Sequence, residues 1–258
     1  MSDVDRWDLI LACRRDGMQL KRAYWTFRSD RFVVLEAVRQ NGKALQFAHD
    51  KLRADKFVAL DAVKNTWEAL GFVSEELLAD KEILMAAVKQ NGMAMSFASA
   101  ELREDRELIA AAVKRDWRAL TYADRSLCED KELLMVAVMQ NGYAYEEAGR
   151  WLRGDRDLVL NAVMKDGLAL EGVPEDLLHD KEIVIEAVQQ NGMALYYAAP
   201  ELQADREVII EAVKNNGHAL KFVPRRFLDD EEVIVHAMRR DSEAIHYASK
   251  RLRALAGV

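Results

Sequence analysis

The chain of 258 residues has few of the residues that reverse or cross-link a polypeptide, with 3 Pro, 12 Gly and 2 Cys. So few Pro and Gly argue against a β-sandwich or barrel, because those folds need many tight chain reversals. Two Cys exclude a disulfide-stapled secreted scaffold and a Cys-rich zinc or iron–sulfur site. No window of about 18 residues is apolar and uncharged, so no membrane span is predicted.

The composition otherwise suits a folded chain. Half of the residues are apolar and 31% are charged, which allows a buried core. The net charge of −7 disfavours non-specific binding to nucleic acid. The segment Met1–Trp7 has no basic region followed by an apolar run, so we expect no secretory signal. The expected location is the cytoplasm, or the cytosol of a host if the protein is an exported effector.

An internal repeat of 25 residues dominates the sequence, and repeats of this kind decide the fold. Asp recurs at this spacing without insertion or deletion, and Ala follows each Asp after seven residues. The Asp positions are Asp5, Asp30, Asp55, Asp80, Asp105, Asp130, Asp155, Asp180, Asp205 and Asp230. Seven copies have Gly twelve residues after the Asp, whereas Trp67, Trp117 and Ser242 replace it in the others.

The first half of each copy has the pattern of an α-helix. In the copy that begins at Asp80, this carboxylate suits the N-cap and Lys89 suits the last turn. The apolar residues of 83–88 cover one helical face. Gly92 is predicted to take the left-handed conformation that ends many helices.

The second half of the same copy predicts a shorter helix. Ala94, Ala98 and Leu102 recur at helical spacing, and no strand-like alternation is present. A pair of helices of this size cannot bury its apolar face alone, but stacked pairs share a core. We therefore predict a single all-α domain over 1–258, an α-solenoid of ten helix-pair repeats without a β-sheet.

A longer period of 50 residues lies on top of the first. The residue two before the Asp alternates between an apolar set (Leu78, Cys128, Leu178 and Leu228) and a polar set (Arg53, Arg103, Arg153, Gln203 and Arg253). Gln-Asn-Gly recurs at 40–42, 90–92, 140–142 and 190–192, in every other copy. The unit is therefore predicted to be a pair of repeats, with the apolar set buried and the polar set exposed.

These motifs resemble a known family of repeats. The pattern Asp-Lys-Glu, then Ala-Val, Asn-Gly and Leu-Arg-x-Asp-Arg, is clearest over 80–105 and 180–206. It resembles domain of unknown function 4116, and weaker copies extend the resemblance over nearly the whole chain. The resemblance implies a helical-repeat fold of five tandem copies. It implies no catalytic residues.

Little in the sequence indicates chemistry. None of the five His has zinc-site spacing, and no glycine-rich phosphate loop is present. Cys13 and Cys128 stand at apolar repeat positions, so we expect small buried side chains rather than nucleophiles. We predict no catalytic residue, no metal and no cofactor, and we expect that the protein is not an enzyme.

A row of cations follows each Asp after nine residues. It begins Arg14, Arg39, Lys64, Lys89 and Lys114, and it is interrupted by Met139, Met164 and Gln189 before Lys214 and Arg239. Residues 1–64 contain 13 Lys and Arg against 9 Asp and Glu, a net charge of +4. One interpretation is a strip that binds an acidic peptide, a phosphate or nucleic acid. The other is a solvated row of cations that complement the helix dipoles.

Departures from the repeat are further candidates. Trp67 and Trp117 replace Gly, and Tyr143 follows the matching turn in the next copy. Exposed aromatic residues would form a surface for a partner, whereas buried ones would cover gaps between repeats. The aromatic residue usual five positions after the Gly is lost at Glu147 and Gly172. This irregularity indicates a groove, a hinge, a partner site or neutral drift.

The sequence thus predicts a non-catalytic scaffold that binds a protein or peptide partner along an extended surface. The candidate contact residues are Trp67, Trp117, Tyr143, Arg39, Lys64, Lys89 and Lys114. One alternative is binding of nucleic acid, or of a phosphorylated or acidic ligand, along 14–114. Another is a small-molecule or enzymatic site near 143–172. The pattern is compatible with a monomer.

Overall fold

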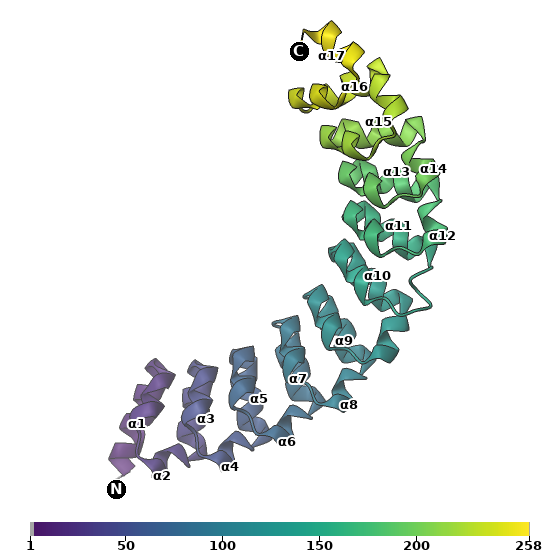
Figure 1. Cartoon of the computed structure of the whole chain (residues 1–258). Coiled ribbons are helices and arrows are strands. Elements are labelled where there is room, and N and C mark those ends of the chain that lie inside the picture. Colours follow the sequence, from purple (N-terminus) through teal and green to yellow (C-terminus); the bar gives the residue numbers. More distant parts are fainter. Residues whose placement is uncertain (1–2, 258) are drawn as a thin grey trace. The chain divides into compact units, whose positions relative to one another are not determined.

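The computed structural model describes residues 3–257, which form helices and turns without any β-strand. The helices group into two compact units, one that ends at Leu127 and one that begins at Cys128 (Figure 1). Each unit is a row of repeats. The all-α repeat fold predicted from the sequence is therefore confirmed.

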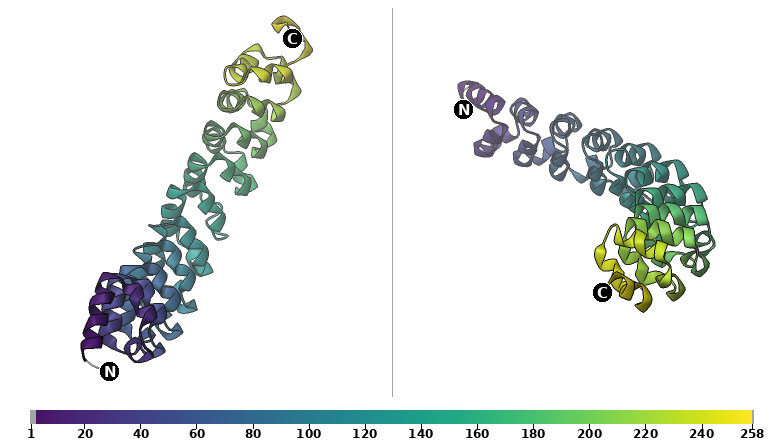
Figure 2. Two further views of the ribbon diagram at one scale, coloured as in Figure 1. Left: turned by 90° about the vertical axis from the view of Figure 1, so that its left-hand side faces the viewer. Right: turned by 90° about the horizontal axis from the view of Figure 1, so that it is seen from above.

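In the first unit, five α-helices stand side by side and consecutive ones contact each other (Figure 2). They are α1 (Asp3–Arg15), α3 (Arg31–Gln40), α5 (Lys56–Asn65), α7 (Lys81–Val88) and α9 (Arg106–Val113). A 3-10 helix follows each, namely η1 (Gly17–Arg22), η2 (Gly42–Phe47), η3 (Trp67–Phe72), η4 (Gly92–Phe97) and η5 (Trp117–Tyr122). Short α-helices lie along one edge of this row: α2 (Trp25–Arg28), α4 (Asp50–Arg53), α6 (Glu75–Leu78) and α8 (Ala100–Arg103).

The second unit repeats the plan after η6 (Arg125–Glu129), which spans the boundary between the units. Its longer helices are α10 (Lys131–Gln140), α11 (Arg156–Lys165), α13 (Lys181–Gln190), α15 (Arg206–Asn215) and α16 (Glu231–Met238). Its 3-10 helices are η7 (Gly142–Glu147), η8 (Gly167–Gly172), η9 (Gly192–Tyr197), η10 (Gly217–Phe222), η11 (Arg225–Asp229) and η12 (Ser242–Tyr247). The short α-helices are α12 (Glu175–Leu178), α14 (Pro200–Gln203) and α17 (Lys250–Ala256).

The second half of a repeat differs from the predicted single helix. In the copy that begins at Asp80 it consists of the 3-10 helix η4 and the separate α-helix α8. Ala98 separates them because its backbone is extended, with φ −64° and ψ 138°. Its N–H donates to the carbonyl of Met95 and closes the last turn of η4.

The Asp series caps helices as predicted, with one exception. Asp80 Oδ1 accepts hydrogen bonds from the backbone N–H groups of Glu82 and Ile83, at 2.9 and 3.3 Å. The other Asp residues from Asp30 to Asp230 also cap their helices, through two such bonds or, at Asp105, Asp130 and Asp155, through the bond from the third residue alone. The prediction was wrong for Asp5, because α1 begins at Asp3 and Asp5 therefore lies inside the helix.

The prediction for Gly92 was also wrong. Within residues 3–257 only Gly257 has a positive φ, so Gly92 is not a left-handed helix end. It begins η4 beside the next repeat, where a Cβ would overlap the carbonyl oxygen of Ala112. Close approach between repeats is therefore the reason for glycine. The same overlap would arise at Gly17, Gly42, Gly142, Gly167 and Gly192.

The Gln-Asn-Gly motif joins one repeat to its neighbours. Gln90 Oε1 accepts from the N–H of Trp67 at 3.0 Å, and its Nε2 donates to the carbonyl of Val63 at 2.6 Å. Asn91 Oδ1 caps η4 through the N–H of Met93 at 2.9 Å. The motif thus contacts the preceding repeat, caps the 3-10 helix and allows the following repeat to approach.

The 50-residue alternation does not separate a buried from an exposed ring. Leu78 and Arg103 are both half-buried. Arg103 Nε donates to the carbonyl of Ala98 at 3.1 Å, and Arg53 Nε donates to that of Phe72 at 2.6 Å. The predicted burial was wrong because Arg53 and Arg103 are half-buried and donate to carbonyls at the end of a 3-10 helix, that of the next repeat for Arg53 and that of its own repeat for Arg103.

Candidate functional site

The starts of the long helices form one edge of each row, which we call the N-terminal edge. There the cation after each Asp pairs with the Asp of the next repeat, at 2.6–3.0 Å. The pairs within the units are Arg6–Asp30, Arg31–Asp55, Lys56–Asp80, Lys81–Asp105, Lys131–Asp155, Arg156–Asp180, Lys181–Asp205 and Arg206–Asp230. Each of these cations therefore forms an ion pair that connects two consecutive repeats.

The last turns of the same helices form the C-terminal edge, where the predicted row of cations lies. Arg14 Nε pairs with Glu36 at 2.6 Å. Arg39 Nε pairs with Asp61 of the next repeat at 2.8 Å. We call the contact between two consecutive repeats a step. At these two steps the cation pairs with a carboxylate that stands six residues after the Asp of the following repeat. Arg39 is therefore already engaged in an ion pair within the fold.

The next two steps lack that carboxylate. Ala86 and Ala111 stand at the positions that correspond to Glu36 and Asp61. Lys64 and Lys89 are exposed, and no carboxylate in residues 3–257 forms an ion pair with either ammonium group. Lys114, the residue that follows α9, is likewise exposed and forms no ion pair within the first unit.

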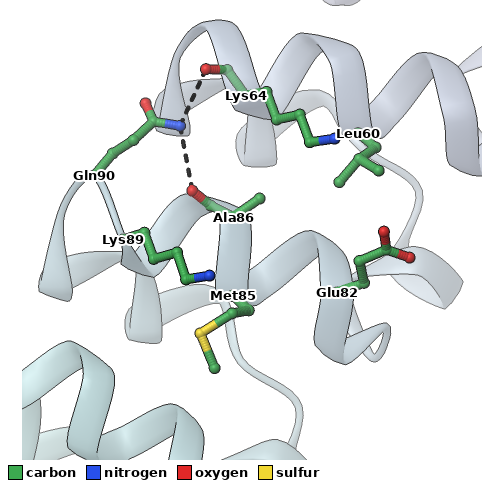
Figure 3. A pocket seen from close by; sticks show the side chains of 7 residues that line it. All are labelled: Leu60, Lys64, Glu82, Met85, Ala86, Lys89 and Gln90. Carbon is green, nitrogen blue, oxygen red and sulfur yellow. Dashed lines mark hydrogen bonds between the residues drawn. The ribbon is translucent and has the colours of Figure 1, made fainter.

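A cavity of about 430 Å³ lies between α5 and α7 beside these two lysines (Figure 3). Lys64 comes from α5, and Lys89 follows the end of α7. The other lining residues are Leu60, Glu82, Met85, Ala86 and Gln90. Glu82 is already paired with Lys56 at 3.0 Å. The cavity therefore combines two unpaired ammonium groups with apolar walls.

Trp67 is half-buried at the same step, where most repeats have Gly. It begins η3, and its N–H lies 3.0 Å from Gln90 Oε1, compared with 2.6 Å for the equivalent bond from Gly17 to Gln40. A side chain larger than Gly cannot fit the close approach found at Gly42. We infer that the indole spaces the two repeats where the cavity opens.

The remaining candidates are not among the residues that line this cavity. Trp117 is half-buried in η5, at the last repeat of the first unit. Tyr143 is 44% exposed, but it lies in η7 of the second unit. Only Lys64 and Lys89 line the cavity, with Trp67 at the same step and Arg39 at the step before.

One part of the irregularity near 143–172, the aromatic residue missing at Gly172, is explained by packing. Tyr145 is fully buried where other repeats have a smaller residue, and its hydroxyl donates to the carbonyl of Arg153 at 2.5 Å. Burial raises the pKa of Tyr145 to about 12. A Cβ at Gly172 would lie 3.8 Å from the ring of Tyr145, so the larger ring takes the space of the aromatic residue lost there.

The predicted apolar cysteines are placed unequally. Cys13 is fully buried, whereas Cys128 is half-buried. Burial, with a smaller contribution from Asp16, raises the pKa of the Cys13 thiol to about 11, so it stays protonated near neutral pH. In residues 3–257 no three His, Cys, Asp or Glu side chains cluster as metal ligands, and none of their helices could span a membrane.

One set of exposed residues was not predicted as a candidate from the sequence. Two positions after the Asp, the first three repeats have Trp7, Phe32 and Phe57, whereas the other seven have an acidic residue. All three rings are exposed. The signal was available as a difference at a fixed repeat position, but it could be found only by comparing the copies column by column.

The fold and the surface together define an α-helical repeat protein, in which the backbone plan recurs and the surface side chains differ between repeats. The chain belongs to the family described as Domain of unknown function (DUF4116), whose model matches residues 9–53, 55–103, 105–153, 155–203 and 205–253. Five tandem copies confirm the predicted unit of two repeats. No curated protein and no solved structure matches the chain.

Proposed function

We propose that this protein is a non-catalytic scaffold that binds an acidic segment of a protein or peptide partner at the cavity between α5 and α7. The observation that carries the proposal is the pair Lys64 and Lys89, two cations without an ion pair at a cavity whose one carboxylate, Glu82, is paired with Lys56. At the two preceding steps the cation of the same repeat position is paired with Glu36 or Asp61. A partner's carboxylate would take the equivalent place.

The apolar lining narrows the expected ligand. Leu60 and Met85 border the two ammonium groups, so an acidic side chain next to an apolar one suits the cavity better than a chain of charges. A carboxylate that is partly withdrawn from water also attracts the ammonium groups more strongly than an exposed one. We therefore expect a short segment that combines Asp or Glu with Leu, Met or Phe.

Nucleic acid is less well supported as the ligand. Arg14 and Arg39 are engaged with carboxylates, so the predicted strip is interrupted before it reaches Lys64. The chain as a whole carries a net charge of −7. An extended polyanion needs a continuous row of free cations, whereas a single acidic segment needs only the local pair.

The test uses variants that neutralise the site in two ways, with binding of a synthetic acidic–apolar peptide measured by calorimetry. Ala86→Glu supplies the carboxylate that Glu36 and Asp61 provide at the two preceding steps, and Lys89→Ala removes one cation. Each should weaken binding about tenfold or more. The matched control is Lys214→Ala, because Lys214 has the same repeat position but pairs with Glu211 at 2.7 Å.

The outcomes separate the alternatives. Peptide binding that is unchanged by Ala86→Glu and Lys89→Ala would contradict the proposal. Binding of a single-stranded oligonucleotide in place of the peptide, with a steep loss on adding salt, would favour the nucleic-acid alternative. A catalytic role is tested separately, by the appearance of any turnover that Ala86→Glu abolishes.

A further inference from the structure

A stripe of exposed aromatic rings follows the N-terminal edge of the first unit. Trp7, Phe32 and Phe57 occupy the same position in α1, α3 and α5, and they are 57%, 67% and 70% exposed. Exposed rings in one register of adjacent repeats are not needed for the shared core. The seven acidic residues at this position in the other repeats show that the fold does not require aromatic side chains there.

The local contacts hold these rings in place and cover one side of two of them. The guanidinium of Arg6 lies 5.7 Å from the centre of the Phe32 ring, and that of Arg31 lies 5.7 Å from the centre of Phe57. Both arginines also pair with the Asp of the next repeat. Where the position is acidic, the preceding cation pairs with it instead, as Lys81 does with Glu107 at 2.7 Å.

The spacing of the stripe follows from helix packing. The helices α1, α3 and α5 contact one another in order, and packed helix axes lie about 8–10 Å apart. Residues at one register therefore recur at about that distance. A polyproline II helix rises about 3.1 Å per residue with three residues per turn, so every third side chain recurs after about 9 Å on one face. The two periods agree.

We propose that the stripe of Trp7, Phe32 and Phe57 is a docking surface for a proline-rich peptide with proline at every third position. Such peptides bind aromatic surfaces in the polyproline II conformation because little chain entropy is lost. Charge complementarity specifies acidic rather than basic flanking residues. Arg31 and Lys56 of this edge are paired with Asp residues, but Lys51 of α4, just before α5, is exposed and has no ion pair in residues 3–257.

A membrane surface fits the stripe less well. The side chain of Asp50, in the short helix before α5, is 90% exposed. Asp30 and Asp55 lie beside the rings in the pairs with Arg6 and Arg31. These carboxylates and ion pairs would have to enter the interface together with the aromatic rings, at a cost that a peptide in water avoids.

The test measures binding of a peptide of about twelve residues, with proline at every third position and acidic ends, to the full chain. The variant Phe32→Glu/Phe57→Glu should bind at least about tenfold more weakly. It should fold normally, because Glu is the residue of other repeats and can pair with Arg6 and Arg31 as Glu107 does with Lys81. The control Glu182→Gln/Glu207→Gln changes the same position in the second unit and should leave binding unchanged.

Two further peptides complete the test, one with a different proline spacing and one with basic ends. A peptide with proline at every fourth position should bind at least about tenfold more weakly, and basic ends should also weaken binding. Equal binding of the two spacings, no effect of the Phe variant, or binding only to anionic vesicles would overturn the proposal. Ala86→Glu should not change binding of this peptide, so this test fails or succeeds independently of the cavity between α5 and α7.

Discussion

Two neighbouring steps of the first unit have the same backbone plan but different chemistry. At the step from α3 to α5, Gly42 lies against the carbonyl of Ala62, and Arg39 pairs with Asp61. At the step from α5 to α7, Trp67 replaces the Gly, Ala86 replaces the acid, and Lys64 faces a cavity. The first step is closed by its own side chains, and the second leaves cations available.

The difference shows how a repeat protein separates stability from recognition. The pair between a cation and the Asp of the next repeat is kept at the N-terminal edge of both steps, with Arg31–Asp55 and Lys56–Asp80 pairs of 2.8 and 2.7 Å. The core positions are also buried in both repeats. Because these contacts hold the repeats together, the C-terminal edge can lose its glycine and its carboxylate without loss of the fold. We infer that binding sites arise at steps where such local contacts are missing.

The largest expected effect comes from disturbing the closed step. In Gly42→Ala the new Cβ would overlap the carbonyl of Ala62, so the repeats must move apart. We expect the free energy of unfolding to fall by about 1–3 kcal/mol, as in other overpacked sites. Urea denaturation followed by circular dichroism measures this change.

The control for that substitution is Gly71→Ala. Gly71 lies in η3, and the nearest atom to an added Cβ is 4.0 Å away in the Phe97 ring. We expect a change within about 0.5 kcal/mol, as for most surface substitutions. Equal losses at Gly42 and Gly71 would show that close approach is not the reason for the glycine.

Much of the fold could be predicted from the sequence because the same residues recur at the same positions of each repeat. Asp80 as an N-cap and Ala87 in the core were both evident from their recurrence at fixed offsets. The role of Gly92 was not, because its constraint comes from the carbonyl of a residue twenty positions away. The sequence of one repeat does not show which atoms of the next repeat lie against it.

The candidate site could be predicted only in part for the same reason. The cation row was visible, but the pairing of Arg39 and the freedom of Lys64 depend on the residue opposite each in the next repeat. Tyr145 and Gly172 show the same limit, since the aromatic residue missing at Gly172 is matched by the larger ring of Tyr145 in the preceding repeat. These contacts could be found in the sequence only by comparing a position of one repeat with a different position of the next repeat.

A smaller difference in stability should separate the carboxylate of Asp55, the N-cap of α5, from that of Asp61 within the helix. Asp55 caps α5 and pairs with Arg31, whereas Asp61 pairs with Arg39 alone. We expect Asp55→Ala to lower the free energy of unfolding by about 1 kcal/mol at neutral pH, the usual cost of a lost N-cap. Asp61→Ala should change it by less, because exposed pairs contribute about 0–1 kcal/mol.

The pH dependence of the Asp55 effect has a definite sign. The hydrogen bond from Arg31 is the main cause of a lowered pKa of Asp55 in the folded state. Its stabilisation is therefore fully present above the unfolded-state value of about 3.9 and is lost as the pH falls through the folded-state pKa. Denaturant unfolding of wild type and Asp55→Ala from neutral pH to about pH 3 should converge. A difference that grows on acidification would contradict this assignment.

The smallest effect compares the cations of the two steps directly. Arg39→Ala removes a partner of Asp61 and should lower the free energy of unfolding by no more than about 1 kcal/mol at low salt, with a smaller loss at high salt. Lys64→Ala removes no ion pair, so stability should stay within about 0.5 kcal/mol at any salt concentration. Paired thermal melts at two ionic strengths measure both. If Lys64→Ala showed the same salt-dependent loss as Arg39→Ala, Lys64 would have a partner within the fold, and the distinction between the closed and the open step would fail.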